Sequence, residues 1–297
     1  MTQIDHRQFV SELDPALKVA LTQRSDWAGL RHLLAHLGVI AVLGLAVLFG
    51  GPIGFLFLVP LGIALVFLFT LEHECTHKTP FQNQLLNEWV GFACGVVLVL
   101  PFTWFRYFHL AHHKWTNIPD KDPELAEPRP ETWWDLVKYT SGLPYWWAGI
   151  QLVLKAALGR VDDEYIPTKA KPRIRAEAAC MLVFYAVVIS TLWLSSAVLW
   201  LWIVPCLLGQ PFLRIYLLAE HGRCPPVANM FENTRTTFTN RIVRLLAWNM
   251  PFHTEHHVFP NVPFYQLPKL HEQTQSHLRV TSDGYSDFAK TYTKTLR

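Results

Sequence analysis

Long apolar runs, interrupted at only a few places, are the main pattern in this sequence. Residues 32–71 and residues 178–213 contain no Asp, Glu, Lys or Arg. A helix that crosses a bilayer needs about 20 predominantly apolar residues. Each of these windows is therefore about two spans long, and the pattern excludes a soluble globular enzyme.

Both windows contain helix-breaking residues near their middle. Gly50, Gly51 and Pro52 interrupt the first window, and Ser195 and Ser196 interrupt the second. Glycine and proline are the strongest breakers of a helical pattern, so each window is predicted to form a hairpin of two helices. The four predicted spans are residues 33–49, 53–71, 178–194 and 197–213.

The basic residues predict the orientation of these hairpins. All 26 Lys and Arg lie outside both windows, so neither hairpin tip carries one. Loops rich in Lys and Arg stay on the cytoplasmic side of a membrane. We therefore expect an all-α integral membrane protein with two transmembrane hairpins and a cytoplasmic, histidine-rich cap. Its expected segments are a cytoplasmic N-terminus (1–32), the first hairpin (33–72), a cytoplasmic and interfacial segment (73–177), the second hairpin (178–213) and the cap (214–297).

A third apolar stretch, residues 89–105, also lacks charged residues. If it crossed the bilayer, the Lys- and Arg-rich segments after it would become external, against the rule used above. We expect it to lie in the membrane plane or to re-enter on the same side. The mixture of Trp and charged residues at 133–155 predicts a helix at the level of the lipid headgroups.

Composition narrows the function classes further. Charged residues make up 16% of the chain, against about 25% in an ordinary soluble domain. A net charge of +3 without a long basic run gives no support for nucleic-acid binding. The five cysteines are scattered and form no CxxC pair, so we expect neither a disulfide framework nor a thiolate metal site.

Histidine is the unusual residue of this sequence. Nine of the 14 histidines fall in the segments HECTH, HLAHH and HTEHH or just after the fourth predicted span. Spacings of three and four residues place side chains on one face of a helix, so members of one cluster can bind the same metal ion. The candidate metal ligands are His73, His77, His109, His112, His113, His221, His253, His256 and His257.

The number of these histidines indicates more than one metal ion. Neutral imidazole suits zinc, copper, iron and nickel. Nine imidazoles exceed the roughly four ligands of a single zinc centre, so two ions with four or five ligands each are predicted. The residues by themselves leave the identity of the metal open.

The histidine clusters resemble the three histidine boxes of the membrane fatty-acid desaturase and hydroxylase superfamily. The order and separation of HECTH, HLAHH and HTEHH agree, as do the two hairpins, so the resemblance covers roughly residues 30–275. The segment NMPFHTEHHVFPNVPFYQLPKL is similar to the third box of sphingolipid and front-end desaturases and of bacterial carotenoid ketolases. HHKWTNIPDKDPE is similar to the second box of the ketolases and related bacterial desaturases.

This resemblance implies a non-haem di-iron centre that activates O₂ and removes hydrogen from an unactivated C–H bond. It also implies that the nine clustered histidines are the iron ligands. In some relatives an Asn one helical turn before the single histidine holds a metal-bound water. Here that position is Leu217, so this part of the family pattern is missing.

Acidic residues beside the histidines are candidates for orienting the imidazole rings. Metal-binding histidines usually donate their second ring N–H to a carboxylate, a carbonyl or water. Glu74, Glu220 and Glu255 each adjoin a candidate ligand. Asp120, Asp122 and Glu124 follow the second cluster, and they are expected to cap the loop or to contact the rings rather than to take part in catalysis. Asn249 is expected to be structural.

Reduction of O₂ requires two electrons from outside the substrate. The sequence contains no glycine-rich dinucleotide fingerprint, no haem-binding CxxCH and no cysteine set for an iron–sulfur cluster. We therefore expect a separate cytoplasmic electron donor of the ferredoxin or cytochrome type.

Three functions remain open at this point. A desaturase and a hydroxylase or ketolase share these boxes and differ in whether oxygen is added to the substrate. A metal transporter or sensor is disfavoured, because transporters place polar ligands near the bilayer midplane and the predicted spans contain only His36. The expected substrate is a lipid acyl chain or related amphiphile that enters from the membrane, with an aminolipid and a carotenoid left open.

Overall fold

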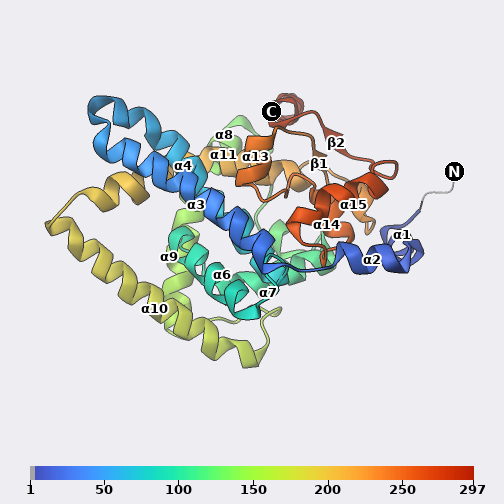
Figure 1. Ribbon diagram of the computed structural model, residues 1–297, viewed down its shortest axis with the longest axis horizontal. Coiled ribbons are helices and arrows are strands. Elements are labelled where there is room, and N and C mark those ends of the chain that lie inside the picture. Colours follow the sequence, from blue (N-terminus) through green and yellow to red (C-terminus); the bar gives the residue numbers. More distant parts are fainter. Residues whose placement is uncertain (1–3) are drawn as a thin grey trace.

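A computed structural model describes residues 4–297, and its secondary structure is almost entirely helical (Figure 1). Four helical segments are long and apolar enough to cross a membrane, with 24, 27, 26 and 23 residues. At about 1.5 Å per residue, each exceeds the roughly 30 Å hydrocarbon core of a bilayer. They are Asp26–Phe49, Gly51–His77, Thr168–Trp193 and Leu199–His221.

The first two long helices are separated at the predicted glycine break. Helix α3 (Asp26–Phe49) begins after Ser25, whose hydroxyl accepts a hydrogen bond from the Ala28 N–H at 3.3 Å. A serine at this position stabilises a helix N-terminus. The break includes Gly51 at φ = +55°, a conformation that glycine adopts without a steric penalty. The second long helix consists of η1 (Gly51–Phe57), α4 (Leu58–Val66) and α5 (Leu68–His77).

The other two long helices are separated at the predicted serine break, residues 194–198. Like α3, these two helices are longer than the charge-free windows predict, because the hydrogen bonding of a helix continues into the polar sequence on either side. As a result, α5 and the last long helix carry clustered histidines on their own final turns. The elements of this pair are α10 (Lys171–Ser190), η4 (Thr191–Trp193), η5 (Leu199–Ile203) and α11 (Val204–His221).

Two glycines allow the second and fourth long helices to cross closely. A Cβ at Gly62 would lie 2.0 Å from the carbonyl oxygen of Pro205, and a Cβ at Gly209 would lie 2.3 Å from the carbonyl oxygen of Gly62. These positions leave no room for a side chain. Small residues at membrane helix crossings let the backbones approach in this way, so α4 and α11 form a close-packed pair.

The third apolar stretch forms two helices with a sharp bend between them. Helix α6 (Gln84–Leu98) and helix α7 (Phe102–Trp115) meet at 98°. Val99, at φ = +58°, ends α6, and Pro101 directly precedes α7. The 15 residues of α6 rise about 22 Å, which is less than the hydrocarbon thickness. Neither helix is therefore long enough to cross a membrane alone.

The outer surfaces of α3 and α10 are apolar and exposed. Only 6% of the apolar window of α3, and 11% of that of α10, is buried inside the molecule. Exposed apolar surface of this extent is typical of a surface that contacts a partner or a membrane. Trp133 and Trp134 on α8 (Trp133–Ser141) and Trp147 on α9 (Leu143–Ala157) are also exposed.

The remaining elements gather around helix α14, at the end of the molecule away from the Gly50–Gly51 turn (Figure 1). They come from both ends of the chain, and two short strands pair in parallel among them. The helices are α1 (His6–Glu12), α2 (Pro15–Leu21), α12 (Met230–Asn233), α13 (Arg241–Leu246), α14 (His253–Val258), α15 (Leu267–Thr274) and α16 (Tyr285–Thr293). The strands are β1 (Thr236–Thr237) and β2 (Thr281–Ser282), and the short 3₁₀ turn η6 (Phe264–Gln266) precedes α15. Two further 3₁₀ turns belong to the middle of the chain: η2 (Pro123–Ala126) follows α7, and η3 (Thr168–Ala170) begins the third long helix.

Candidate metal centre

All nine clustered histidines meet in the interior of the protein. They lie on α5, α7, α11 and α14, which are far apart in the sequence. The centroid of each ring lies 4.0–4.8 Å from that of its nearest partner. Seven of the nine residues are buried, and His77 and His113 are half-buried.

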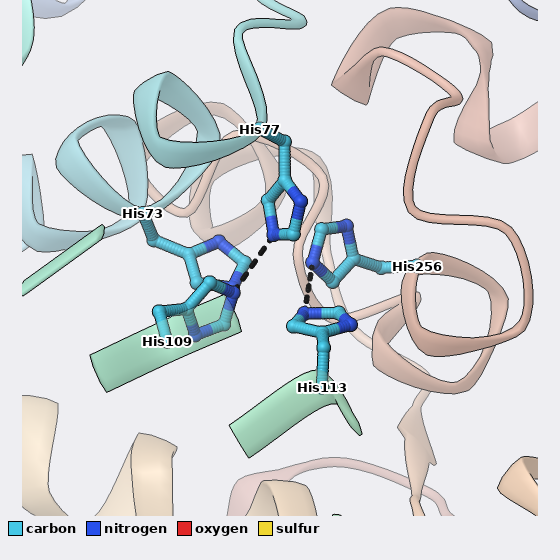
Figure 2. A group of neighbouring side chains, drawn as sticks. All are labelled: His73, His77, His109, His113 and His256. Atoms are coloured by element: carbon cyan, nitrogen blue, oxygen red, sulfur yellow. Dashed lines mark hydrogen bonds between the residues drawn. The ribbon is translucent and has the colours of Figure 1, made fainter. Parts of the chain in front are cut away.

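One group contains five imidazoles with nitrogens within 4.8 Å of one another (Figure 2). The Nε2 atoms of His77 and His109 are 2.8 Å apart, and those of His113 and His256 are 3.1 Å apart. Both ring nitrogens of His73 are buried without a hydrogen-bond partner. This fifth imidazole therefore has a free ring nitrogen beside the other four.

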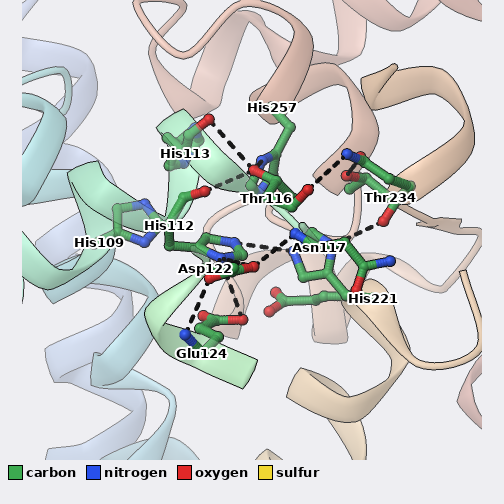
Figure 3. Close-up of polar contacts among 12 residues, drawn as sticks. His109, His112, His113, Thr116, Asn117, Asp122, Glu124, His221, Thr234 and His257 are labelled. Atoms are coloured by element: carbon green, nitrogen blue, oxygen red, sulfur yellow. Dashed lines mark hydrogen bonds and ion pairs between the residues drawn. The ribbon is translucent and has the colours of Figure 1, made fainter. Parts of the chain in front are cut away.

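A second group lies next to the first. His112, His221 and His257 have nitrogens within 4.8 Å of one another, and Figure 3 shows these three rings together. The Nε2 atom of His221 is 3.2 Å from that of His112. The Nε2 atom of His253 is 3.2 Å from that of His221 and 3.1 Å from that of His257, so His253 joins this group.

These distances fit nitrogens that share a metal ion. Two ligands about 2.1 Å from an ion, separated by 90–109°, lie about 3.0–3.4 Å apart. Burial lowers the pKa of His253, His256 and His257 well below the usual value for imidazole. These rings are therefore neutral near pH 7, which is the form that binds metal. The two groups could hold two ions, with five and four imidazole ligands.

Several of the rings are held through their second nitrogen. Nδ1 of His112 lies 2.9 Å from the carboxylate of Asp122, which also accepts hydrogen bonds from backbone N–H groups of the following loop (Figure 3). Asp122 thus both caps the loop and contacts a candidate ligand ring, which are the two roles expected for the acids after the second histidine cluster. Nδ1 of His257 lies 3.2 Å from the Thr116 hydroxyl, and Nδ1 of His221 lies 3.1 Å from the carbonyl oxygen of Asn233.

Two of the three predicted orienting acids lie beside a ring, but not beside the ring of the neighbouring residue. Glu220 lies on α11, and its carboxylate is 3.3 Å from Nδ1 of His253 on α14. Glu74 on α5 lies 3.7 Å from Nδ1 of His256. These are close polar contacts rather than aligned hydrogen bonds. Each acid therefore faces a histidine from a different segment.

The structure corrects the expectation for Glu255. Its carboxylate accepts a hydrogen bond from the Thr236 hydroxyl at 2.6 Å and also contacts His271. Adjacent residues on a helix do not face each other, so Glu255 points away from the ring of His256. Its contacts join α14 to β1 and α15 rather than orienting a candidate ligand.

His36, and Asn249, which was expected to be structural, both lie outside the two groups. The Nε2 atom of His36 is 2.8 Å from the Ala64 carbonyl oxygen, and Nδ1 accepts a hydrogen bond from Trp248. The Asn249 side chain accepts a hydrogen bond from Arg244 and donates one to the Phe264 carbonyl oxygen.

A cavity of about 1060 Å³ reaches the metal centre from one side. This volume is slightly above the roughly 300–1,000 Å³ typical of small-molecule sites. Part of the wall is apolar, and part is formed by the polar segments 120–129 and 162–165. The candidate ligands that line the cavity are His73, His109, His112, His221 and His253, and its apolar wall includes Phe69, Leu100, Phe105, Leu152 and Leu217.

Four apolar helices and a buried cluster of nine imidazoles define a membrane protein with a histidine-rich site suited to metal. The model of the fatty acid desaturase family matches residues 50–285. The chain therefore belongs to the fatty acid desaturase family and is an oxidoreductase.

The chain is similar to several desaturases over most of its length. It is 26% identical over 247 residues to an sn-1 oleoyl-lipid 12-desaturase of Anabaena variabilis, covering 75% of this chain and 68% of the relative. It is 24% identical to a chloroplastic omega-6 fatty acid desaturase of Arabidopsis thaliana, covering 72% and 51%. It is 26% identical to a sphingolipid delta(4)-desaturase of Gallus gallus, covering 66% and 58%. The chain thus spans between about half and two thirds of the length of these relatives.

The contact between Asp122 and His112 predicts a difference between two acid-to-amide substitutions. Asp122→Asn removes the negative charge beside a candidate ligand, and metal affinity should fall about 10–100-fold. Glu255→Gln changes an acid that contacts no candidate ligand, and metal affinity should stay close to that of the unchanged protein. Metal content after dialysis against a graded series of chelator concentrations measures both. Equal losses in the two variants would contradict the assignment.

Proposed function

We propose that this protein is a membrane di-iron oxidoreductase that desaturates a lipid acyl or related amphiphilic chain. The observation that carries the proposal is the pair of imidazole groups, five of whose members line a partly apolar cavity. Membership of the fatty acid desaturase family favours iron over the other metals that imidazole binds.

The proposed ligand sets follow the two imidazole groups. His73, His77, His109, His113 and His256 would hold one iron ion, and His112, His221, His253 and His257 would hold the other. When bound, the two irons supply the activation of O₂ and the oxidising power for C–H cleavage. Asp122 orients the ring of His112, and Thr116 orients the ring of His257, in each case through the Nδ1 atom of the histidine.

The proposed reaction balances with two external electrons: R–CH₂–CH₂–R′ + O₂ + 2 e⁻ + 2 H⁺ → R–CH=CH–R′ + 2 H₂O. Two of the four electrons that reduce O₂ come from the two C–H bonds, and two come from a separate donor. The protein's part is to hold the acyl chain beside the imidazole groups and to exclude water. The apolar wall at Phe69, Phe105 and Leu217 suits that task.

One face of α9 would position the substrate chain. Tyr145, Ala148, Gly149 and Leu152 all line the cavity, and their spacing of three and four residues places them on one side of the helix. The polar segments 120–129 and 162–165 of the cavity wall would then face the head of the lipid. Burial of each CH₂ group contributes about 0.8 kcal/mol, so an acyl chain gains binding energy from length alone.

We also propose that both termini and the metal centre are cytoplasmic, because both hairpin tips lack Lys and Arg. A membrane-impermeant maleimide applied to intact cells should label Ser196→Cys at a hairpin tip. It should label Glu127→Cys and Lys290→Cys only after the membrane is permeabilised, with the unchanged protein as the background control. Labelling of Glu127→Cys in intact cells would contradict this topology.

Lipid mass spectrometry of cells that express the protein tests the reaction. Cells with the unchanged protein should contain lipids two hydrogen atoms lighter than their precursors, because desaturation removes hydrogen without adding oxygen. His256→Ala should abolish these products, whereas His277→Gln, outside both imidazole groups, should retain them at matched expression. A product heavier by one oxygen would instead identify a hydroxylase or ketolase.

The cavity predicts an effect of substrate length. Ala148→Phe adds a ring to the cavity face of α9 and should reduce desaturation of long chains more than that of short ones, without loss of iron. Ile150→Phe adds the same ring at an exposed position outside the cavity wall and should leave the product distribution unchanged. The chain lengths of unsaturated lipids measure both. A similar product profile for the two variants would show that this cavity does not hold the chain.

A further inference from the structure

A second depression reaches the metal centre from a different direction. This groove has a volume of about 690 Å³, and its lining includes His113 and His257, one from each imidazole group. Neither histidine lines the cavity of about 1060 Å³ described above, which is the proposed substrate cavity and is lined by five other histidines of the centre. The candidate metal site is therefore accessible through two openings that expose different ligands.

The groove is basic. Arg7, Lys114 and Lys121 are exposed in its wall, and among the described residues that line it there is no Asp or Glu. The polar segments of the substrate cavity have the opposite character, with more acidic than basic side chains. Lys121 lies at the border and lines both openings, whereas Arg7 and Lys114 line the groove alone. Clefts lined by one sign of charge attract oppositely charged partners and speed their association by about 10–1,000-fold.

The basic wall is directly connected to the candidate ligands. The Trp115 ring lies below two cations, with the Lys114 Nζ atom 5.0 Å and the Lys121 Nζ atom 4.5 Å from its centroid. The next residue, Thr116, contacts Nδ1 of His257 at 3.2 Å. A partner seated on Trp115 would thus be separated from the imidazole groups by one layer of side chains.

We propose that this groove, defined by Arg7, Lys114, Trp115 and Lys121, docks a soluble one-electron carrier protein with an acidic surface. The inference rests on the proposed function, which needs two external electrons per turnover. Two carriers dock in succession, and each is oxidised by one electron that enters past His113 and His257. The substrate cavity stays free meanwhile, because it opens onto other members of the centre.

A protein partner fits this groove better than an anionic lipid surface does. Part of its wall comes from α1, which lies with α14 at the end of the molecule away from the Gly50–Gly51 turn of the long helices (Figure 1). The apolar surfaces that suit a membrane are those of α3 and α10. The groove itself combines exposed cations with an aromatic floor, as interfaces with charged partners commonly do.

Charge reversal tests the docking site without requiring a known substrate. Two acidic probes, a plant-type [2Fe–2S] ferredoxin and a flavodoxin, are titrated against the iron-loaded protein in nanodiscs of neutral lipid. Arg7→Glu and Lys121→Glu should each weaken binding of both probes about tenfold at low salt, with a shallower salt dependence. Lys290→Glu reverses an exposed charge outside the groove and should bind as the unchanged protein does. Basic cytochrome c should not bind.

Electron transfer provides the second readout. Mixing with reduced ferredoxin in a stopped-flow instrument should show slower ferredoxin oxidation for Arg7→Glu and Lys121→Glu. Reduction of the bound iron by dithionite should be the same in all variants. If dithionite reduces no bound metal while the groove still binds the probes, the proposed function fails and the docking site stands.

Three results would overturn the docking proposal. The unchanged protein could fail to bind either acidic probe. The three charge reversals could weaken binding equally, which would indicate a nonspecific effect of net charge. Finally, Arg7→Glu and Lys121→Glu could reduce binding to phosphatidylglycerol vesicles and leave binding of both probes unchanged, which would make the groove a lipid-binding surface.

Discussion

The close approach of nine imidazole rings is the constraint on which the rest of this structure depends. Nitrogens held 2.8–3.2 Å apart in a buried site need both the helices and the ring orientations to be fixed in advance. The Gly62–Gly209 crossing joins two of the helices, since any side chain there would force α4 and α11 apart. Asp122 and Thr116 then hold individual rings from behind. A bound metal would stabilise this arrangement further, because the same contacts form its site.

Much of the fold and the histidines of the centre could be predicted from the sequence, but the physical reason is different for the helices and for the histidines. Charge-free windows predicted four long apolar helices, since a bilayer excludes charge, and Gly50–Gly51 and Ser195–Ser196 located the breaks. The bend between α6 and α7 could not be predicted in detail. An apolar stretch of 17 residues indicates an apolar environment, but it does not show where the backbone changes direction. Histidine spacing singled out eight of the nine histidines that meet in the interior, because i, i+3 and i+4 positions share a helix face. His221 was singled out only by its place just after the fourth predicted span.

The contacts that orient the rings could not be predicted from sequence neighbours. Glu74 and Glu220 each face a histidine from a distant segment, and Glu255 faces His271. Adjacent residues on a helix point in different directions, so sequence adjacency to a ligand carries little information about contact with it. The partner of His221 is the backbone carbonyl of Asn233, for which no side-chain signal exists. The two openings to the centre, one partly apolar and one basic, likewise arise only when distant segments are brought together.

Metal analysis of the purified protein, combined with Mössbauer spectroscopy after loading with ⁵⁷Fe, tests the central claim most directly. The account predicts two iron ions per chain, in two coordination environments that both disappear as the clustered histidines are replaced. A single ion per folded chain, or two ions whose content is unchanged in His221→Ala and His256→Ala, would contradict the assignment of nine imidazoles to a di-iron centre.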